Sequence, residues 1–203
     1  MGLLKIKITM TKTEIITAAE NIFKQFSETC STIDESRLFK KPENKWSAAE
    51  NMQHLIISTN TTSLAFWLPK FLVRWIGGTP NRASRTFDEL KDKYYTKLSE
   101  GGKASGRFVP KPIEVKYGKP ARMNPARMNL SGWRSDGQKL IDNWNKATAK
   151  FLHTLNKNRS EKDLDSYLVK HPLLGRITLR ELCYFTIFHT QHHLLSIHKL
   201  TED

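Results

Sequence analysis

The chain has 203 residues, of which 38% are hydrophobic and 26% charged, and its formal net charge is +13. These values are ordinary for one globular domain that is long enough to bury a core. The chain contains two cysteines, Cys30 and Cys183, without CxxC spacing. This argues against a disulfide framework and a thiolate zinc site, and it suits a reducing compartment.

We expect a single domain over residues 1–203, of which residues 1–10 form a flexible N-terminal extension. Residues 1–10 have neither a long apolar core nor a small-residue cleavage site, so they do not resemble a signal peptide. The longest apolar run, Leu64–Ile76, is interrupted by Pro69, Lys70 and Arg74. It is too short and too charged to span a membrane, so we expect a soluble cytoplasmic protein without a membrane partner.

The first two predicted helices begin at capping boxes. Thr11 and Glu14 open the first helix, and Ser47 and Glu50 open the second, which runs through His54 to about Thr62 or Leu68. The apolar residues of the first helix recur with helical periodicity: Ile15, Ile16, Ala19, Ile22, Phe23 and Phe26.

Residues 77–131 form a long basic insertion that we predict to be mostly loop. It contains a short helix over Asp88–Leu98, weak strand signals at Phe108–Val109 and Ile113–Val115, and a tandem five-residue repeat over 120–129. Most of the glycines and prolines lie here, which is typical of irregular backbone.

The basic residues concentrate between Arg82 and Arg134. Such a surface suits nucleic acid, anionic lipid or an acidic small molecule. No nucleic-acid motif accompanies the charge, so a solvated basic surface is favoured and nucleic acid is not an expected partner. A basic nucleic-acid-binding stress protein stays open as an alternative function.

Two more helices complete the predicted fold. The third spans about Gly132–Asn156, and the fourth follows a capping box at Thr178 and Glu181 and continues to about Leu200. Pro172 and Gly175 mark a loop before the fourth helix. The pattern predicts an all-α fold, an antiparallel four-helix bundle with a long loop-rich crossover between helices 2 and 3.

His189 and His193 are the first candidate ligands, because residues four apart lie on one face of a helix. They fall on the apolar stripe of the fourth helix, which contains Leu182, Phe185, Ile197 and Leu200. A buried polar group without a partner costs about 1–3 kcal/mol. Either a metal ion or hydrogen bonds from other side chains must therefore satisfy these imidazoles.

The remaining histidines have weaker patterns. His54 lies one turn from Glu50, Asn51 and Ser58, a polar patch that periodicity alone assigns to solvent. His153, His171 and His198 have no partner at ligand spacing and are interpreted as surface or packing residues, and His192 is expected to be exposed.

Two segments resemble one known family. The segment Lys45–Leu55 resembles the pattern W-S-x-x-E-x-x-x-H-L. The segment His171–Glu181, followed by His189-x-x-x-His193, resembles H-P-x-x-G-x-x-T-x-x-E followed by H-x-x-x-H. Together they are similar to the DinB-like superfamily of antiparallel four-helix bundles with one long crossover. The resemblance implies a metal triad of His54, His189 and His193, whereas residues 77–131 depart from it.

Three imidazoles leave open positions on a divalent ion, as in catalytic rather than structural sites. The resembling superfamily is associated with metal-dependent transfer of low-molecular-weight thiols and with related hydrolase or isomerase chemistry. We therefore expect a divalent metal, zinc or nickel, that activates water or a thiol for transfer or hydrolysis of a small-molecule substrate. The basic surface favours an anionic thiol. A non-catalytic metal-binding or small-ligand-binding bundle is the alternative.

The acid or base of such a reaction is not readable from the sequence. Glu50 is one candidate for orienting His54 or transferring a proton, although its capping role is favoured. Tyr184 and Gln191 have weaker claims, and neither cysteine is positioned as a nucleophile.

Trp67, Phe71 and Trp75 crowd a segment that charged residues interrupt. Exposed aromatic patches often mark contacts between subunits, so we expect a homodimer. The same residues could instead pack under the long middle loop.

Overall fold

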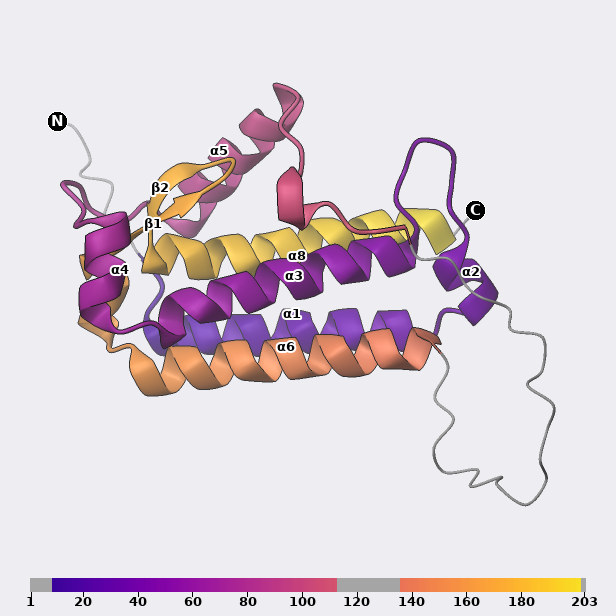
Figure 1. Ribbon diagram of the computed structural model, residues 1–203, viewed down its shortest axis with the longest axis horizontal. Helices are drawn as coiled ribbons and strands as arrows, with labels where there is room; N and C mark the ends of the chain where they lie inside the picture. Colours follow the sequence, from indigo (N-terminus) through magenta and orange to yellow (C-terminus); the bar gives the residue numbers. More distant parts are fainter. Residues whose placement is uncertain (1–8, 113–135, 202–203) are drawn as a thin grey trace, which may run out of the picture.

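The computed structural model describes residues 9–112 and 136–201 of the chain (Figure 1). The described residues form mostly helices with one small sheet, which confirms the predicted all-α class. The long helices are α1 (Lys12–Ser31), α3 (Ala48–Trp67), α6 (Asp136–Asn158) and α8 (Leu179–Thr201). The shorter elements are α2 (Glu35–Phe39), α4 (Lys70–Gly77), α5 (Phe87–Ser99), the 3-10 turn η1 (Gly106–Phe108) and α7 (Glu161–Ser166).

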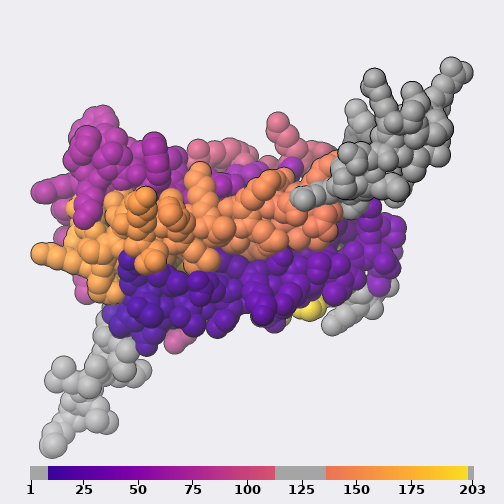
Figure 2. All heavy atoms as spheres, turned by 90° about the horizontal axis from the view of Figure 1, so that it is seen from below, coloured from indigo at the N-terminus to yellow at the C-terminus, as the bar shows by residue number. Residues whose placement is uncertain are grey.

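The four long helices lie side by side, and α1 and α6 cover one face of the molecule (Figures 1 and 2). These two helices run antiparallel. The Lys12 ammonium at the start of α1 donates to the Asn156 carbonyl at 2.8 Å, and the Ser27 hydroxyl donates to the Asn145 side chain at 2.9 Å. The start of one helix therefore meets the end of the other.

Helices α3 and α8 also run antiparallel, because Asn51 contacts His193 and His54 contacts His189. The other two neighbouring pairs, α1 with α8 and α3 with α6, run parallel (Figure 1). Helix α6 begins beside α2, where the Gly137 N–H donates to the Glu35 carboxylate at 3.2 Å. The chain thus returns after α3 to the end at which α3 began, and the expected antiparallel order describes two of the four neighbouring pairs.

All three predicted capping boxes are present. Thr11 and Ser47 cap α1 and α3 with the glutamates that were expected. At the start of α8, the side chains of Thr178 and Glu181 each accept the backbone N–H of the other residue. The described part of the predicted third helix ends at Asn158, and its expected first residues, 132–135, lie outside the described residues.

The loop that Pro172 and Gly175 mark before α8 is the turn of a β-hairpin, whose two strands were not predicted. Strand β1 (Leu168–His171) pairs antiparallel with β2 (Gly175–Thr178), and Gly175 has a φ of 75° at the turn. Four-residue strands have little periodicity of their own, and only the turn residues were visible in the sequence.

The structure of the middle segment agrees in part with the prediction. The predicted short helix is confirmed as α5, whereas the expected strand at Phe108–Val109 is wrong because Phe108 belongs to η1. The expected strand at 113–115 and the tandem repeat at 120–129 lie outside the described residues, as does residue range 1–8 of the expected N-terminal extension.

Met10, which the sequence assigned to a flexible extension, is anchored. Its N–H donates to the Tyr184 hydroxyl at 2.9 Å, and its carbonyl accepts a hydrogen bond from the Arg180 guanidinium. Tyr184 is buried on α8. The start of α1 is therefore tied to the first turns of α8.

Helix α4 lies against the hairpin at a point where only glycine fits. A Cβ atom at Gly77 would lie 1.6 Å from the backbone oxygen of Leu168. The Leu168 N–H donates to the Gly78 carbonyl at 3.0 Å. This close backbone approach places α4 beside β1 at the end of α3.

The core fills the space between the four long helices. The Trp144 ring packs edge-on against Phe23 with centroids 5.4 Å apart, and its indole N–H donates to the Phe23 carbonyl at 3.2 Å. Burial raises the pKa of Cys30 to about 12 and raises that of Cys183 further, so neither thiol is ionised at neutral pH. Among the described helices, none has the length and apolarity needed to cross a membrane.

Candidate metal centre

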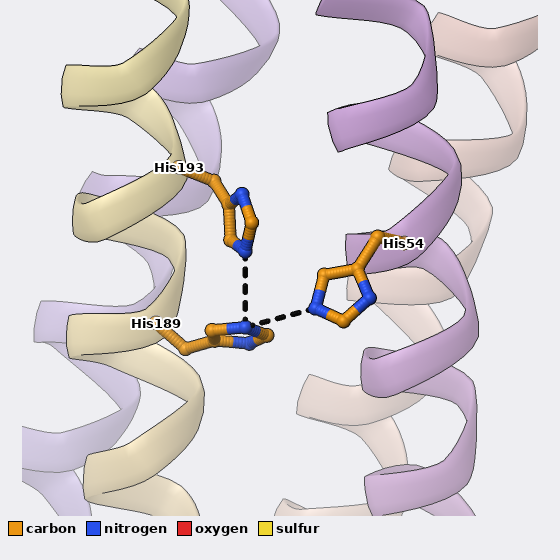
Figure 3. A group of neighbouring side chains, drawn as sticks. All are labelled: His54, His189 and His193. Atoms are coloured by element: carbon orange, nitrogen blue, oxygen red, sulfur yellow. Dashed lines mark hydrogen bonds between the residues drawn. The ribbon is translucent and has the colours of Figure 1, made fainter. Parts of the chain in front are cut away.

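His54 on α3 and His189 and His193 on α8 point toward one another (Figure 3). The His189 Nε2 atom lies 3.0 Å from His54 Nε2 and 3.1 Å from His193 Nε2. All three side chains are buried, with His54 only 6% exposed. The solvent position that periodicity assigned to His54 is therefore wrong, because its polar neighbours lie on a buried face.

The outer nitrogens of two imidazoles have fixed partners. His54 Nδ1 donates to the Phe108 carbonyl, and His193 Nδ1 donates to Asn51 Oδ1, both at 2.6 Å. The Asn51 amide nitrogen donates to the Ser47 carbonyl at 2.8 Å, which leaves Oδ1 facing His193. Because both partners of the histidines are acceptors, the ring protons sit on Nδ1 and the lone pairs on Nε2.

This tautomer assignment tests whether the cluster suits a metal ion. The Nε2 lone pairs of His54 and His193 both face His189 Nε2. A single proton on His189 Nε2 cannot make two linear hydrogen bonds, so one contact between nitrogens stays unsatisfied. A cation among the three nitrogens would satisfy every lone pair, and neutral imidazole is a ligand for zinc and other late transition metals. The donor set therefore fits a divalent metal.

Burial keeps these imidazoles neutral. Desolvation lowers the pKa of His54, against the opposing effect of the Phe108 carbonyl. It also lowers the pKa values of His189 and His193 far below 6.5, and the neighbouring histidines add to this shift. Neutral rings have the free lone pairs that metal binding requires.

Aromatic rings surround the cluster. The Phe185 ring stacks on His189 with centroids 4.5 Å apart, and the Tyr94 ring meets the edge of His189 at 6.0 Å. Trp46 lies 5.1 Å from the His54 ring and nearly parallel to His193 at 6.3 Å. These apolar surfaces restrict the rotation of the imidazoles and limit the access of water.

The cluster opens into a cavity of about 840 Å³, to which all three histidines contribute. His171 also lines this cavity and packs on Phe185 with centroids 4.2 Å apart. Its Nδ1 accepts the N–H groups of Leu173 and Leu174 at 3.2 and 3.1 Å, and burial lowers its pKa to about 4. His171 is thus a packing residue, as expected, but one that faces the site.

Glu50 has the capping role that the sequence favoured. One carboxylate oxygen accepts the Ser47 N–H at 2.9 Å, and the other pairs with the Lys41 ammonium at 2.9 Å. Both oxygens are therefore engaged outside the group of histidine nitrogens. Glu50 supports the first turn of α3 rather than the cluster itself.

Tyr184 and Gln191, the other weak candidates, are not among the residues that line the cavity of the cluster. The Tyr184 hydroxyl binds the Met10 N–H, and Gln191 lines a separate hollow of about 350 Å³ that also contains Ile22. His192 is half-buried rather than exposed, because its ring packs against Tyr94, and it lines the cavity beside the cluster.

Asn51 and Phe108 are the site residues that the sequence analysis did not assign. Asn51 precedes His54 by three residues, a spacing that places a polar group beside it on one helix face. Phe108 contributes only its backbone carbonyl, which has no side-chain signature. Its position was unpredictable because η1 lies in the irregular middle segment.

Part of the predicted basic insertion holds α8 in place. Arg82 forms two hydrogen bonds with the Glu181 carboxylate, at 2.7 and 2.8 Å, and Arg85 contributes its guanidinium and its N–H. Burial pulls the pKa of Glu181 upward, but the bonds from Arg82, Arg85 and Thr178 outweigh it and lower the pKa. The first turn of α8 is therefore anchored two turns before His189.

Comparison with known proteins identifies the family. No curated protein is similar enough in sequence to count as a match. The sequence model of the DinB superfamily matches residues 20–197, a range that includes both motif segments and all three histidines. Because this match covers most of the chain, the protein belongs to the DinB superfamily.

Proposed function

We propose that His54, His189 and His193 bind one divalent metal ion, zinc or nickel, and that the protein acts on a small-molecule substrate there. The observation that carries this proposal is the convergence of three buried histidines, whose ligand nitrogens all lie within 4.8 Å of one another. A divalent ion with three imidazole ligands keeps open positions, at which a bound water or low-molecular-weight thiol becomes more acidic.

The residues around the cluster have separate tasks in this proposal. Asn51 and the Phe108 carbonyl hold the protons of His193 and His54 on Nδ1 and orient both rings. The rings of Phe185 and Trp46, which contact His189 and His54, limit the access of water to the cluster. Arg107, which lines the cavity, would attract an anionic thiol. The reaction would be transfer of a thiol or hydrolysis.

Elemental analysis tests the metal. Protein purified without chelator and without a metal-affinity tag should contain one equivalent of zinc or nickel. Replacing His193 with alanine should remove the metal. It should leave the helical content unchanged, because the apolar core that holds the helices together does not include the histidines. His153→Ala is the matched control, since His153 is exposed on α6 and should not affect metal content. Stoichiometric metal in His193→Ala would refute the proposal.

Two alternatives have distinct outcomes. Intact metal binding without turnover in a screen of thiols and electrophiles would favour a non-catalytic metal-binding or small-ligand-binding protein. Binding of nucleic acid that falls steeply with salt and does not depend on metal would favour a basic stress protein.

We also propose a homodimer that forms through the aromatic surface of α3 and α4. Trp67, Phe71 and Trp75 are 61%, 69% and 81% exposed. Aromatic residues are enriched at the centres of protein interfaces, and their exposure in one chain supports association. Sedimentation should detect a dimer that Trp75→Asp abolishes, and a monomer at high micromolar concentration would exclude it.

A further inference from the structure

The cavity beside the three histidines is much longer than the cluster. It extends along α3 from His54 to Leu68, a distance of about 21 Å at 1.5 Å per residue. At its far end it is bounded by Val73 and Ile76 of α4 and by Leu168 of β1. Its volume of about 840 Å³ lies in the upper part of the range for small-molecule sites.

The polarity of the walls changes along this length. On α3, the lining residues begin with His54, Ser58 and Thr62 and end with Ala65 and Leu68. Helix α8 runs antiparallel to α3, so its lining residues also change from polar to apolar away from the cluster: His193 and His189 come first, followed by Phe185 and Leu182. The cavity therefore has a polar end at the histidines and an apolar end beneath α4.

The charges on the walls have one sign. Lys103, Arg107 and Lys170 line the cavity and are exposed, and none of its lining residues in the described parts of the chain is aspartate or glutamate. Arg107 is at the polar end, because it directly precedes Phe108, whose carbonyl binds His54. Its guanidinium lies 5.1 Å from the centre of the Phe108 ring. An anionic group at the polar end would thus be attracted.

We propose that this cavity binds a single-chain anionic amphiphile of the fatty-acid type, with its acidic head near Arg107 and the histidines. Its apolar chain would lie between α3 and α8 and end beneath α4, where it would bury against Leu68, Val73 and Leu168. The inference deepens the proposed function, since it names a substrate class for the same site and rests on that function for any reaction. Binding itself requires no metal.

Calorimetric titration of metal-free protein with dodecanoate, kept below its micellar concentration, tests the proposal. One equivalent should bind, more tightly than hexanoate because the longer chain reaches the apolar end. It should also bind more tightly than dodecyltrimethylammonium, which has the same chain and the opposite charge. Equal affinity for the two head groups, or for the two chain lengths, would overturn the proposal.

A matched pair of variants locates the chain. Leu64 lines the cavity and is 46% exposed, whereas Leu195 on α8 is 59% exposed and does not line it. Leu64→Glu should weaken dodecanoate binding about tenfold through charge repulsion, and Leu195→Glu should leave it unchanged. Equal weakening by both substitutions would indicate adsorption to the surface and would refute a site in the cavity.

A second variant changes chain length rather than charge. Ala65→Trp should fill the apolar end, reduce dodecanoate binding and preserve hexanoate binding. Unchanged dodecanoate binding in Ala65→Trp would contradict the proposed chain position. Metal analysis of the same samples separates the two proposals: dodecanoate binding without a metal site refutes the proposed function alone, and a metal site without dodecanoate binding refutes this inference alone.

Discussion

Replacement of Asn51 with leucine should weaken the proposed metal centre without removing a ligand. The change keeps a side chain of similar size but removes the acceptor that lies 2.6 Å from His193 Nδ1. A buried N–H without a partner costs about 1–3 kcal/mol, and we expect the unfolding free energy of the metal-free protein to fall by that amount. The Ser47 carbonyl keeps a partner, because it also accepts the Asn51 backbone N–H at 3.0 Å.

The same change should reduce metal affinity by about 10–100-fold, because His193 would lose its fixed tautomer and orientation. Competition with a chromophoric chelator measures the affinity, and urea unfolding measures the stability. Asn145→Leu is the matched control: Asn145 is exposed on α6, and its side chain accepts a hydrogen bond from the Ser27 hydroxyl, so both quantities should stay near the wild-type values. Wild-type metal affinity in Asn51→Leu would refute the role of Asn51.

Two further predictions concern stability. Metal-free protein should lose stability as the pH falls below about 6.5, because the pKa of His171 is about 4 and those of His189 and His193 are far below 6.5 in the folded chain. The unfolded chain then binds more protons, so stability is complete above the unfolded pKa and declines toward the folded values; a flat profile in urea unfolding between about pH 8 and pH 4.5 would contradict this. Glu181→Gln should lower the unfolding free energy by about 2 kcal/mol through weaker bonds to Arg82 and Arg85, whereas Glu14→Gln should cost less because its carboxylate is exposed at the capping box of α1. Equal losses would show that the two arginines add nothing to the cap.

The starts of the long helices could be predicted because capping boxes are local. Thr11 with Glu14 and Ser47 with Glu50 lie three residues apart, so their reciprocal hydrogen bonds do not depend on distant parts of the chain. The pairing of His189 with His193 is local for the same reason. The hairpin was missed because its strands have four residues each and are held by docking against α4 rather than by their own pattern.

The burial of His54 could not be predicted from the periodicity of the sequence. Its neighbours Asn51 and Ser58 are polar, which indicates solvent in an amphipathic helix. In the structure both are buried, since the polar face of α3 lines the histidine cluster and its cavity. Only the motif resemblance placed His54 with the other two histidines, because a motif includes the distant partner that periodicity lacks.

Helix α3 packs its apolar side chains on one face and presents the residues of the histidine cluster on another. Toward α6 it presents Phe66, which packs on Phe151 with ring centroids 5.5 Å apart. Toward α8 it presents Asn51, which bonds to the Ser47 carbonyl and to His193, and His54, whose Nδ1 bonds to the Phe108 carbonyl and whose Nε2 faces His189. The buried hydroxyls of Thr62 and Ser63 on α3 donate to the carbonyls of Ser58 and Thr59 in the same helix. Substitutions at the histidines therefore remove little of the apolar contact between helices, which is why loss of metal and loss of fold should be separable in this protein.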